Sequence, residues 1–255
     1  SIDSSSKIFK KIADERFFYF LSESHTSLYK ARNLALKKIN GDFLCFLDAD
    51  DMMKIDRLEK QIKFFLENND LGVVYCNQEI LNQITKRKSI FIKKNDKIDE
   101  SLKILKRQSA TILNSLIKKS ELFKLKKYFN ENYNIIGDLD LLFRLSKNCK
   151  FKYLNETLVS YRLHQNNYSK FNRDEEIEEL DDMMSDFKSN DLFNSEELKT
   201  FQNTINLRKI LNLIIKKNIK EAYKDINALQ DNFLKIKLIF YLILPNTILK
   251  RLINF

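Results

Sequence analysis

An apolar run that ends in three carboxylates constrains this chain more than any other feature. Residues 43–51 read Phe-Leu-Cys-Phe-Leu-Asp-Ala-Asp-Asp. The run has the length and bulk of a buried parallel strand, and open α/β sheets form their ligand crevice where such strands end. Asp48 and Asp50 alternate along an extended backbone and therefore share one side of it. The pattern predicts a sheet edge that carries carboxylates at a place suited to binding.

Carboxylates packed this closely repel one another, because each charge disfavours ionisation of the next. A divalent cation relieves the repulsion, and hard oxygen ligands suit Mg²⁺ or Mn²⁺, which keep open positions for phosphates. The alternative is a solvated acidic turn that caps the following helix. The Asp-x-Asp pattern does not decide between them, since it is expected about once by chance in a chain of this length.

Composition limits the class of protein. The 255 residues are 44% hydrophobic, which is enough for a core in one large domain, or in one domain with an appendage. A net charge of +10 suits binding to nucleic acid or to an anionic membrane, but the lysines are scattered and no nucleic-acid motif stands out, so we expect no nucleic-acid partner.

Three well-separated cysteines without a Cys-x-x-Cys pair indicate a reduced, cytoplasmic protein. The longest apolar run, residues 238–244, is too short to span a bilayer, and no signal peptide is visible.

Strands and helices alternate through residue 76, which predicts an α/β fold with a mostly parallel sheet flanked by helices. In the helix at 27–39, Leu28, Ala31, Ala35 and Ile39 are predicted to share one face. The other expected elements are helices at 4–13, 55–67 and 138–147, strands at 16–21, 43–47, 72–76 and 110–117, a hairpin or loop at 80–97, and a strand pair or extended segment at 151–163.

The pattern becomes helical throughout from residue 172. We therefore expect a domain at residues 1–171 and a helical region at 172–255. The acidic run Asp174–Asp182 is interpreted as a solvated helix face rather than a binding site.

A second acidic stretch reads Gly137-Asp138-Leu139-Asp140. Gly137 allows close backbone approach or an unusual torsion. Asp138 lies at or near a helix start, where free amide groups stabilise a carboxylate, so a plain N-cap is one interpretation and a chemical role the other. Asp140 and Arg144 are four residues apart and are predicted to form an ion pair, which makes Asp140 structural.

The chain has two histidines. His164 follows a strand and begins a polar loop, where it is either a metal ligand or phosphate donor, or an exposed loop residue. His25 lies in a polar segment and is predicted to be on the surface.

The C-terminal residues 233–255 mix large apolar side chains with Lys and Arg, and Pro245 interrupts them. Such a basic amphipathic helix either lies in a membrane interface or packs against the rest of the chain or a partner.

Several of these blocks, in this order and spacing, resemble family 2 glycosyltransferases of GT-A fold. The resemblance covers about residues 1–170, and its specificity comes from the joint pattern rather than from any one piece. The blocks are Ala31-Arg32-Asn33, Phe46-Leu47-Asp48-Ala49-Asp50-Asp51 with Arg57-Leu58 and Gln61, Gly137-Asp138-Leu139-Asp140 with Arg144-Leu145, and Tyr161-Arg162-Leu163-His164.

The resemblance implies an inverting transfer from a nucleotide-diphosphate sugar to a glycan or lipid-linked acceptor, in bacterial surface polysaccharide synthesis. It implies that Asp138 is the catalytic base and that Arg32 and Asp48 lie at the nucleotide. It also implies that Asp50, Asp48 and His164 hold a divalent cation, Mn²⁺ or Mg²⁺. The expected location is the cytoplasm, with contact to an anionic membrane at its inner face as a further option.

The chain departs from the family pattern in three places. Residues 1–6 resemble only the tail of the family's acidic segment, so the first strand and much of the nucleotide-base pocket are expected to be missing. A glycine expected before Ala31 is replaced near Ser27, and the usual proline after the acidic cluster is absent. Two alternatives therefore stay open: an inactive or truncated glycosyltransferase-like protein that acts through protein contacts, and an unrelated metal-dependent phosphoryl-transfer enzyme.

Overall fold

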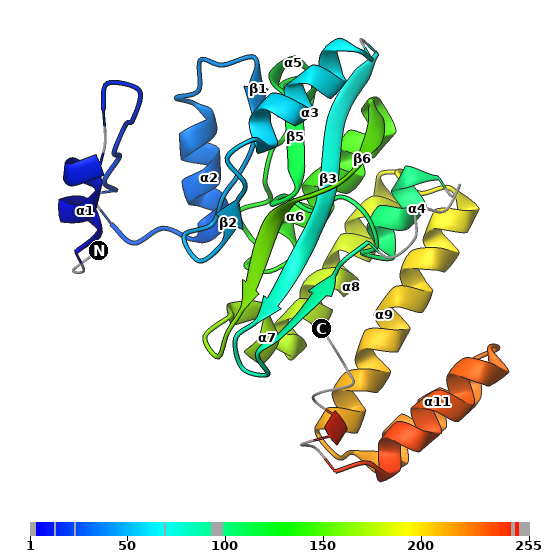
Figure 1. Ribbon diagram of the computed structural model, residues 1–255. Helices are drawn as coiled ribbons and strands as arrows, with labels where there is room; N and C mark the ends of the chain where they lie inside the picture. Colours follow the sequence, from blue (N-terminus) through cyan, green and yellow to red (C-terminus); the bar gives the residue numbers. More distant parts are fainter. Residues whose placement is uncertain are drawn as a thin grey trace.

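A mixed sheet lies at the centre of the computed structural model (Figure 1), which describes residues 4–12, 14–22, 24–68, 70–92, 99–245 and 248–249. Within these residues the strand order is β1-β5-β3-β6-β2, and β4 pairs with the C-terminal part of β3, residues 79–82. The strands are β1 (Phe43–Leu44), β2 (Met52–Met53), β3 (Leu71–Asn82), β4 (Arg87–Ile90), β5 (Ser115–Lys118) and β6 (Lys150–Leu163).

The prediction of a mostly parallel sheet was wrong in the direction of its strands. Among the described strands, β3 and β6 pair in parallel along most of their length, and the other pairings are antiparallel. The turn at residues 83–86 explains one of these, because so short a connection joins antiparallel neighbours and a parallel pair needs a long crossover. The hairpin predicted at 80–97 is thus confirmed up to residue 92, and 93–97 lie outside the described residues.

Helices cover both faces of this sheet, as predicted for an α/β fold. The alternation of β3 sends Val73 and Tyr75 into the main core and Val74 towards α3 on the other face. The helices are α1 (Ser5–Ile12), α2 (Leu28–Leu36), α3 (Arg57–Leu66), α4 (Glu100–Leu105), α5 (Lys119–Leu122), α6 (Gly137–Asn148), α7 (Tyr168–Phe171), α8 (Arg173–Ser189), α9 (Ser195–Ile215), α10 (Ile219–Ala228) and α11 (Asn232–Ile243).

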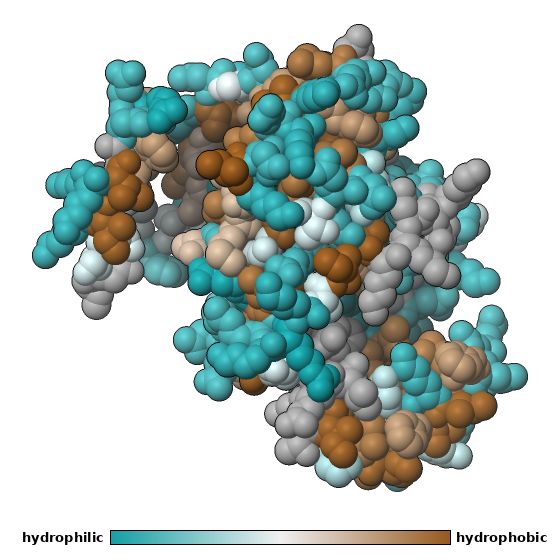
Figure 2. Space-filling model, in the orientation of Figure 1, coloured by the Kyte–Doolittle hydropathy of each residue, from teal (hydrophilic) through white to brown (hydrophobic). Residues whose placement is uncertain are grey.

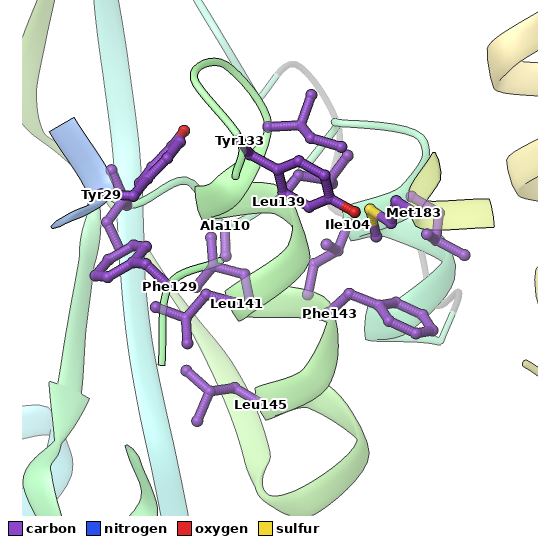
Figure 3. Packing of buried hydrophobic residues seen from close by; sticks show 14 of the residues in the cluster. Tyr29, Ile104, Ala110, Phe129, Tyr133, Leu139, Leu141, Phe143, Leu145 and Met183 are labelled. Carbon is purple, nitrogen blue, oxygen red and sulfur yellow. The ribbon is translucent and has the colours of Figure 1, made fainter. Parts of the chain in front are cut away.

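The main core joins both predicted domains. Figure 3 shows Tyr29 of α2, Ile104 of α4, Phe143 of α6 and Met183 of α8 gathered in one cluster. The cluster continues to Phe201 in α9, so apolar packing crosses residue 172 without a break. A second cluster joins the end of α9 to α10 and α11 at the far end of the molecule (Figure 1). The boundary between residues 171 and 172 stays a prediction.

Two local predictions were wrong. Residues 16–21 form no strand, and Phe18 and Phe20 are 74% and 64% exposed. The buried face of α2 consists of Tyr29, Arg32 and Leu36 rather than the predicted stripe, because aromatic rings enclose the arginine. Across the described ranges, no helix is both long and apolar enough to cross a membrane.

Candidate functional site

The three carboxylates lie in a tight turn, here called the acidic tip (residues 48–51). The backbone N–H of Asp51 donates to the carbonyl of Asp48 at 3.0 Å and closes the turn. The chain then enters β2, which pairs with Val159 and Ser160 of β6. This pairing holds the tip against the end of β6, where each carboxylate meets a different partner.

Arg32 anchors the tip from α2. Its guanidinium carbon lies 5.4–5.6 Å from the ring centroids of Tyr29, Phe46 and Phe129, within cation–π range. One Nη atom then donates to Asp48 Oδ1 at 2.6 Å. Arg32 is only 8% exposed, so the aromatic rings fix its direction and the ion pair fixes the carboxylate of Asp48.

Arg162 of β6 clamps the backbone of the tip. Its main-chain N–H donates to Asp51 Oδ1 at 2.9 Å, and its guanidinium donates to the carbonyl of Asp50. Arg162 lies in β6 two residues before His164, which follows the end of the strand, and this spacing was the sequence signal for the contact.

His164 pairs with the second carboxylate of the tip. Its Nε2 lies 2.9 Å from Asp50 Oδ2, while its Nδ1 accepts a hydrogen bond from the Asn166 N–H at 3.1 Å. An Nδ1 that accepts is unprotonated, so the proton sits on Nε2 and is donated to Asp50. His164 is therefore a paired, partly buried residue rather than a free loop histidine, and its role as a metal ligand or phosphate donor stays a prediction. His25 is exposed as predicted.

Asp51 is a carboxyl of the tip whose ionisation is disfavoured by its surroundings. Burial raises its pKa to about 6, the hydrogen bond from the Arg162 backbone opposes this, and the charges of Asp50 and Asp48 add to the rise. The shift shows that the tip concentrates negative charge at a partly desolvated place.

Asp138 lies in the first turn of α6, where the helix dipole favours a carboxylate. Its Oδ1 accepts from the N–H of Leu139 at 2.9 Å. Glu179 of α8, a buried side chain, binds the backbone of the loop before Asp138. This carboxylate accepts from three successive backbone N–H groups, those of Asn134, Ile135 and Ile136, at 2.5–3.0 Å.

Helix α2 brings the acidic tip and the Asp138 turn together. Tyr29 and Arg32 are three residues apart and so lie on one helix face. Arg32 holds Asp48, whereas the Tyr29 hydroxyl donates to the carbonyl of Ile135 at 2.8 Å. The ring of Tyr29 packs so closely on Gly137 that a Cβ there would lie 2.6 Å from it, which confirms the expected close approach.

Electrostatics give a second link between the two acidic stretches. Burial raises the pKa of Tyr161 to about 12, and the charges of Asp51, Asp50 and Asp138 all add to the rise. Carboxylates from both stretches therefore act on one phenol of β6, which lies next to Arg162 in the same strand.

Arg107 is a cation behind the candidate site that sequence analysis missed. It follows α4 in a left-handed conformation (φ 55°), and its guanidinium donates to Glu176 of α8. Burial lowers the pKa of Arg107, but the charges of Glu176 and Asp138 raise it by more, so the pKa is raised overall. A cation thus lies within electrostatic range of Asp138, and no local motif indicated it.

The interpretation of residues 174–182 as a solvated face holds for the exposed Asp174, Glu178 and Asp182 but is wrong for Glu176 and Glu179. They are 7% and 8% exposed, and Glu176 also pairs with Arg208 of α9. By contrast, the ion pair predicted between Asp140 and Arg144 is confirmed, with Arg144 Nε 3.0 Å from Asp140 Oδ1.

The residues of the tip offer a partial set of metal ligands. Asp50 and His164 present an oxygen and a nitrogen 2.9 Å apart. His164 could bind a cation through Nε2 once its proton has moved to Nδ1 and the hydrogen bond from the Asn166 N–H has opened, and the cation would take its other ligands from phosphate and water. Asp48 fits less well, because Arg32 already occupies it. Within the described ranges, no group of three or more His, Cys, Asp or Glu side chains is arranged to hold a metal.

Comparison with known proteins identifies the class. Residues 1–120 match the family model described as Glycosyl transferase family 2. The structure is similar to that of S. aureus TarS in complex with UDP-GlcNAc, with a TM-score of 0.67 at 18% identity over 90% of this chain and 68% of that one. The chain therefore resembles family 2 glycosyltransferases over residues 1–120 and has a GT-A fold.

Curated relatives agree with this class. An uncharacterized glycosyltransferase of Methanocaldococcus jannaschii is 27% identical over 61% of this chain and 54% of its own length. The Escherichia coli UDP-Glc:alpha-D-GlcNAc-diphosphoundecaprenol beta-1,3-glucosyltransferase WfgD is 39% identical over 28% of each chain. The putative teichuronic acid biosynthesis glycosyltransferase TuaG of Bacillus subtilis is 41% identical over 22% of each. The chain spans about half the length, 54%, of the Methanocaldococcus protein.

Proposed function

We propose that this chain transfers a sugar from a nucleotide-diphosphate donor to a glycan or lipid-linked acceptor, with inversion, in bacterial surface polysaccharide synthesis. WfgD, named for a UDP-glucose donor and a diphosphoundecaprenol-linked acceptor, and TarS, solved with UDP-GlcNAc, support the donor and acceptor classes. The proposed location is the cytoplasm. The three free cysteines agree with it.

One observation carries the proposal: the single helix α2 binds both the acidic tip, through Arg32, and the turn before Asp138, through Tyr29. Displacement at an anomeric carbon needs a base on one side of the sugar and charge neutralisation on the other. Two carboxylate groups held together by one rigid element meet that need.

In the proposed mechanism, Asp138 accepts the proton of the acceptor hydroxyl while the hydroxyl oxygen bonds to the anomeric carbon. The bond from that carbon to the diphosphate breaks, and the diphosphate leaves with the electron pair. Asp50 and His164 are the proposed ligands of a divalent cation, with Asp48 held beside the nucleotide by Arg32. A cation bound there would neutralise charge on the leaving diphosphate.

Calorimetric titration of nucleoside diphosphates into the full chain, with and without Mn²⁺, tests the proposal. We expect Mn²⁺-dependent binding that weakens at least about tenfold in Asp50→Ala, because one of the two protein ligands is lost. Asp56→Ala is the matched control, since Asp56 pairs with Lys60 at the surface and its removal leaves the tip intact.

Two results would contradict the proposal. If no nucleoside diphosphate binds, the alternative of an inactive protein that acts through protein contacts gains support. If Asp50→Ala binds as the unchanged chain does, the metal and donor assignment of the tip is wrong.

A further inference from the structure

Helix α11 carries a continuous apolar stripe that faces solvent. Phe233, Ile236, Phe240 and Ile243 are spaced by three, four and three residues, so they lie on one helix face. Their exposed fractions are 80%, 69%, 51% and 76%. Figure 2 shows hydrophobic side chains gathered at the end of the molecule where α11 lies.

The opposite face of α11 fixes the helix in place. Leu238 and Leu242 are buried in the second hydrophobic cluster, against residues of α9 and α10. The helix is therefore anchored on one side, and its stripe is held outward as part of a folded surface. A helix that is apolar all round while one side meets water lacks a partner on that side.

Positive charge borders the stripe on both sides. At about 100° per residue, Lys235 and Lys237 lie about 100° to either side of the centre of the stripe. No Asp or Glu occurs within α11, and no described carboxylate forms an ion pair with either lysine. Residues 216–255 contain eight Lys or Arg and three Asp or Glu, which makes this end of the chain strongly basic.

We propose that α11 rests on an anionic lipid surface, with its apolar stripe in the boundary between headgroups and acyl chains. The lysines reach back to lipid headgroups along their own aliphatic stems. The basic border selects this partner, because a second copy of the chain would set these lysines against an equally basic surface. The inference concerns binding alone and does not rest on the proposed sugar transfer.

The absence of tryptophan from the chain allows a clean reporter. Phe240→Trp places a single fluorophore in the stripe. Leu66→Trp places one at the end of α3, where the Leu66 side chain is 69% exposed. Vesicles of phosphatidylcholine, alone or with one quarter phosphatidylglycerol, are added to the full chain. With anionic vesicles, the emission of the Phe240→Trp chain is expected to move to shorter wavelength and to be quenched by brominated acyl chains, whereas the α3 reporter stays unchanged.

Two substituted chains separate the apolar and the charged contributions. Ile236→Gln with Phe240→Gln is expected to weaken vesicle co-sedimentation at least about tenfold, since it removes half of the stripe. Lys235→Glu with Lys237→Glu is expected to abolish the preference for anionic vesicles, and added salt is expected to weaken binding by the unchanged chain. All four side chains are at the surface, so the melting temperatures are expected to stay close to that of the unchanged chain.

Other results would overturn the proposal. The unchanged chain could fail to sediment with anionic vesicles at low salt, or the double glutamine chain could sediment equally well. A dimer in sedimentation velocity that dissociates in the double glutamine chain would make a second copy the occupant of the stripe. Equal emission shifts of the two reporters would show non-specific adsorption.

Discussion

The acidic tip at residues 48–51 and the acidic run of α8 contain the same kinds of side chain and use them differently. Asp48 and Asp50 of the tip keep more than 40% of their side chains exposed, beside Arg32 and His164. Glu176 and Glu179 of α8 are almost fully buried, one against two arginines and the other against three backbone N–H groups. The tip leaves carboxylate available to a ligand, whereas α8 uses its own to build the scaffold behind Asp138.

This comparison teaches that acidity alone does not separate a binding site from a scaffold. What separates them is the position of the acidic residue relative to the buried face of its helix. Glu176 and Glu179 each lie four residues before a buried apolar residue of α8, Leu180 and Met183 respectively, and so they face the core. A charge in phase with a buried face must be paired, because an unpaired buried charge is very costly. The two stretches should therefore respond differently to substitution, in activity for one and in stability for the other.

The largest expected effect is at Asp138, whose preceding loop is bound by Glu179 of α8 and by Tyr29 of the helix that also holds the tip. Asp138→Asn is expected to lower the rate of transfer about 10²–10⁴-fold, because the amide cannot accept the acceptor's proton. Donor and cation affinity should stay nearly unchanged, since these depend on the tip. Steady-state kinetics and calorimetry on the same chain measure both quantities. A collapse of donor affinity would remove Asp138 from the role of base.

Glu176 is expected to show the largest effect on stability. Glu176→Ala leaves Arg107 and Arg208 without this shared carboxylate and is expected to cost about 3–5 kcal/mol of unfolding free energy. Asp174→Ala on the same helix removes an exposed pair with Lys216 and is expected to cost about 0–1 kcal/mol. Urea denaturation of both chains is the measurement, and equal losses would mean that burial does not distinguish the two pairs.

The smallest and most specific effect is expected at Glu179, which acts on Asp138 only through the backbone. Glu179→Gln replaces one accepting oxygen by an N–H donor that opposes the amides of the 134–136 loop. The expected result is a kcat lower by about tenfold to a hundredfold with little change in donor KM, because the base is displaced. Glu178→Gln, on the exposed side of α8, is the matched control. A change in KM alone would make Glu179 a binding residue.

Local spacing was enough to predict part of this structure. The pair Asp140–Arg144 depends on neighbours four residues apart, and the structure confirms it. The apolar run before Asp48 was predicted as a buried parallel strand, but only Phe43 and Leu44 form a strand, and it pairs antiparallel with β5. The close approach at Gly137 is confirmed, although the ring that packs there, Tyr29, lies far earlier in the chain. The helical character after residue 172 was equally visible, because a period of 3.6 repeats along a long segment.

Other features depend on residues far apart in the chain. Arg32 is buried because Phe129, 97 residues later, completes its aromatic surroundings, and no local pattern announces such a contact. The direction of the strands escaped prediction for a related reason. Short two-residue strands such as β1 and β2 carry almost no periodicity, and the partner of each is decided by the whole sheet.

The unbroken helix α9 has a geometric consequence. Its N-terminal half contributes Phe201 and Ile205 to the main core, and its C-terminal half contributes Ile210 and Ile214 to the second cluster. Its 21 residues make a rod of about 31 Å. The length of α9 therefore fixes the distance between the main core and any surface that α11 contacts. Removing one helical turn would shorten it by about 5.4 Å and swing the two ends out of register.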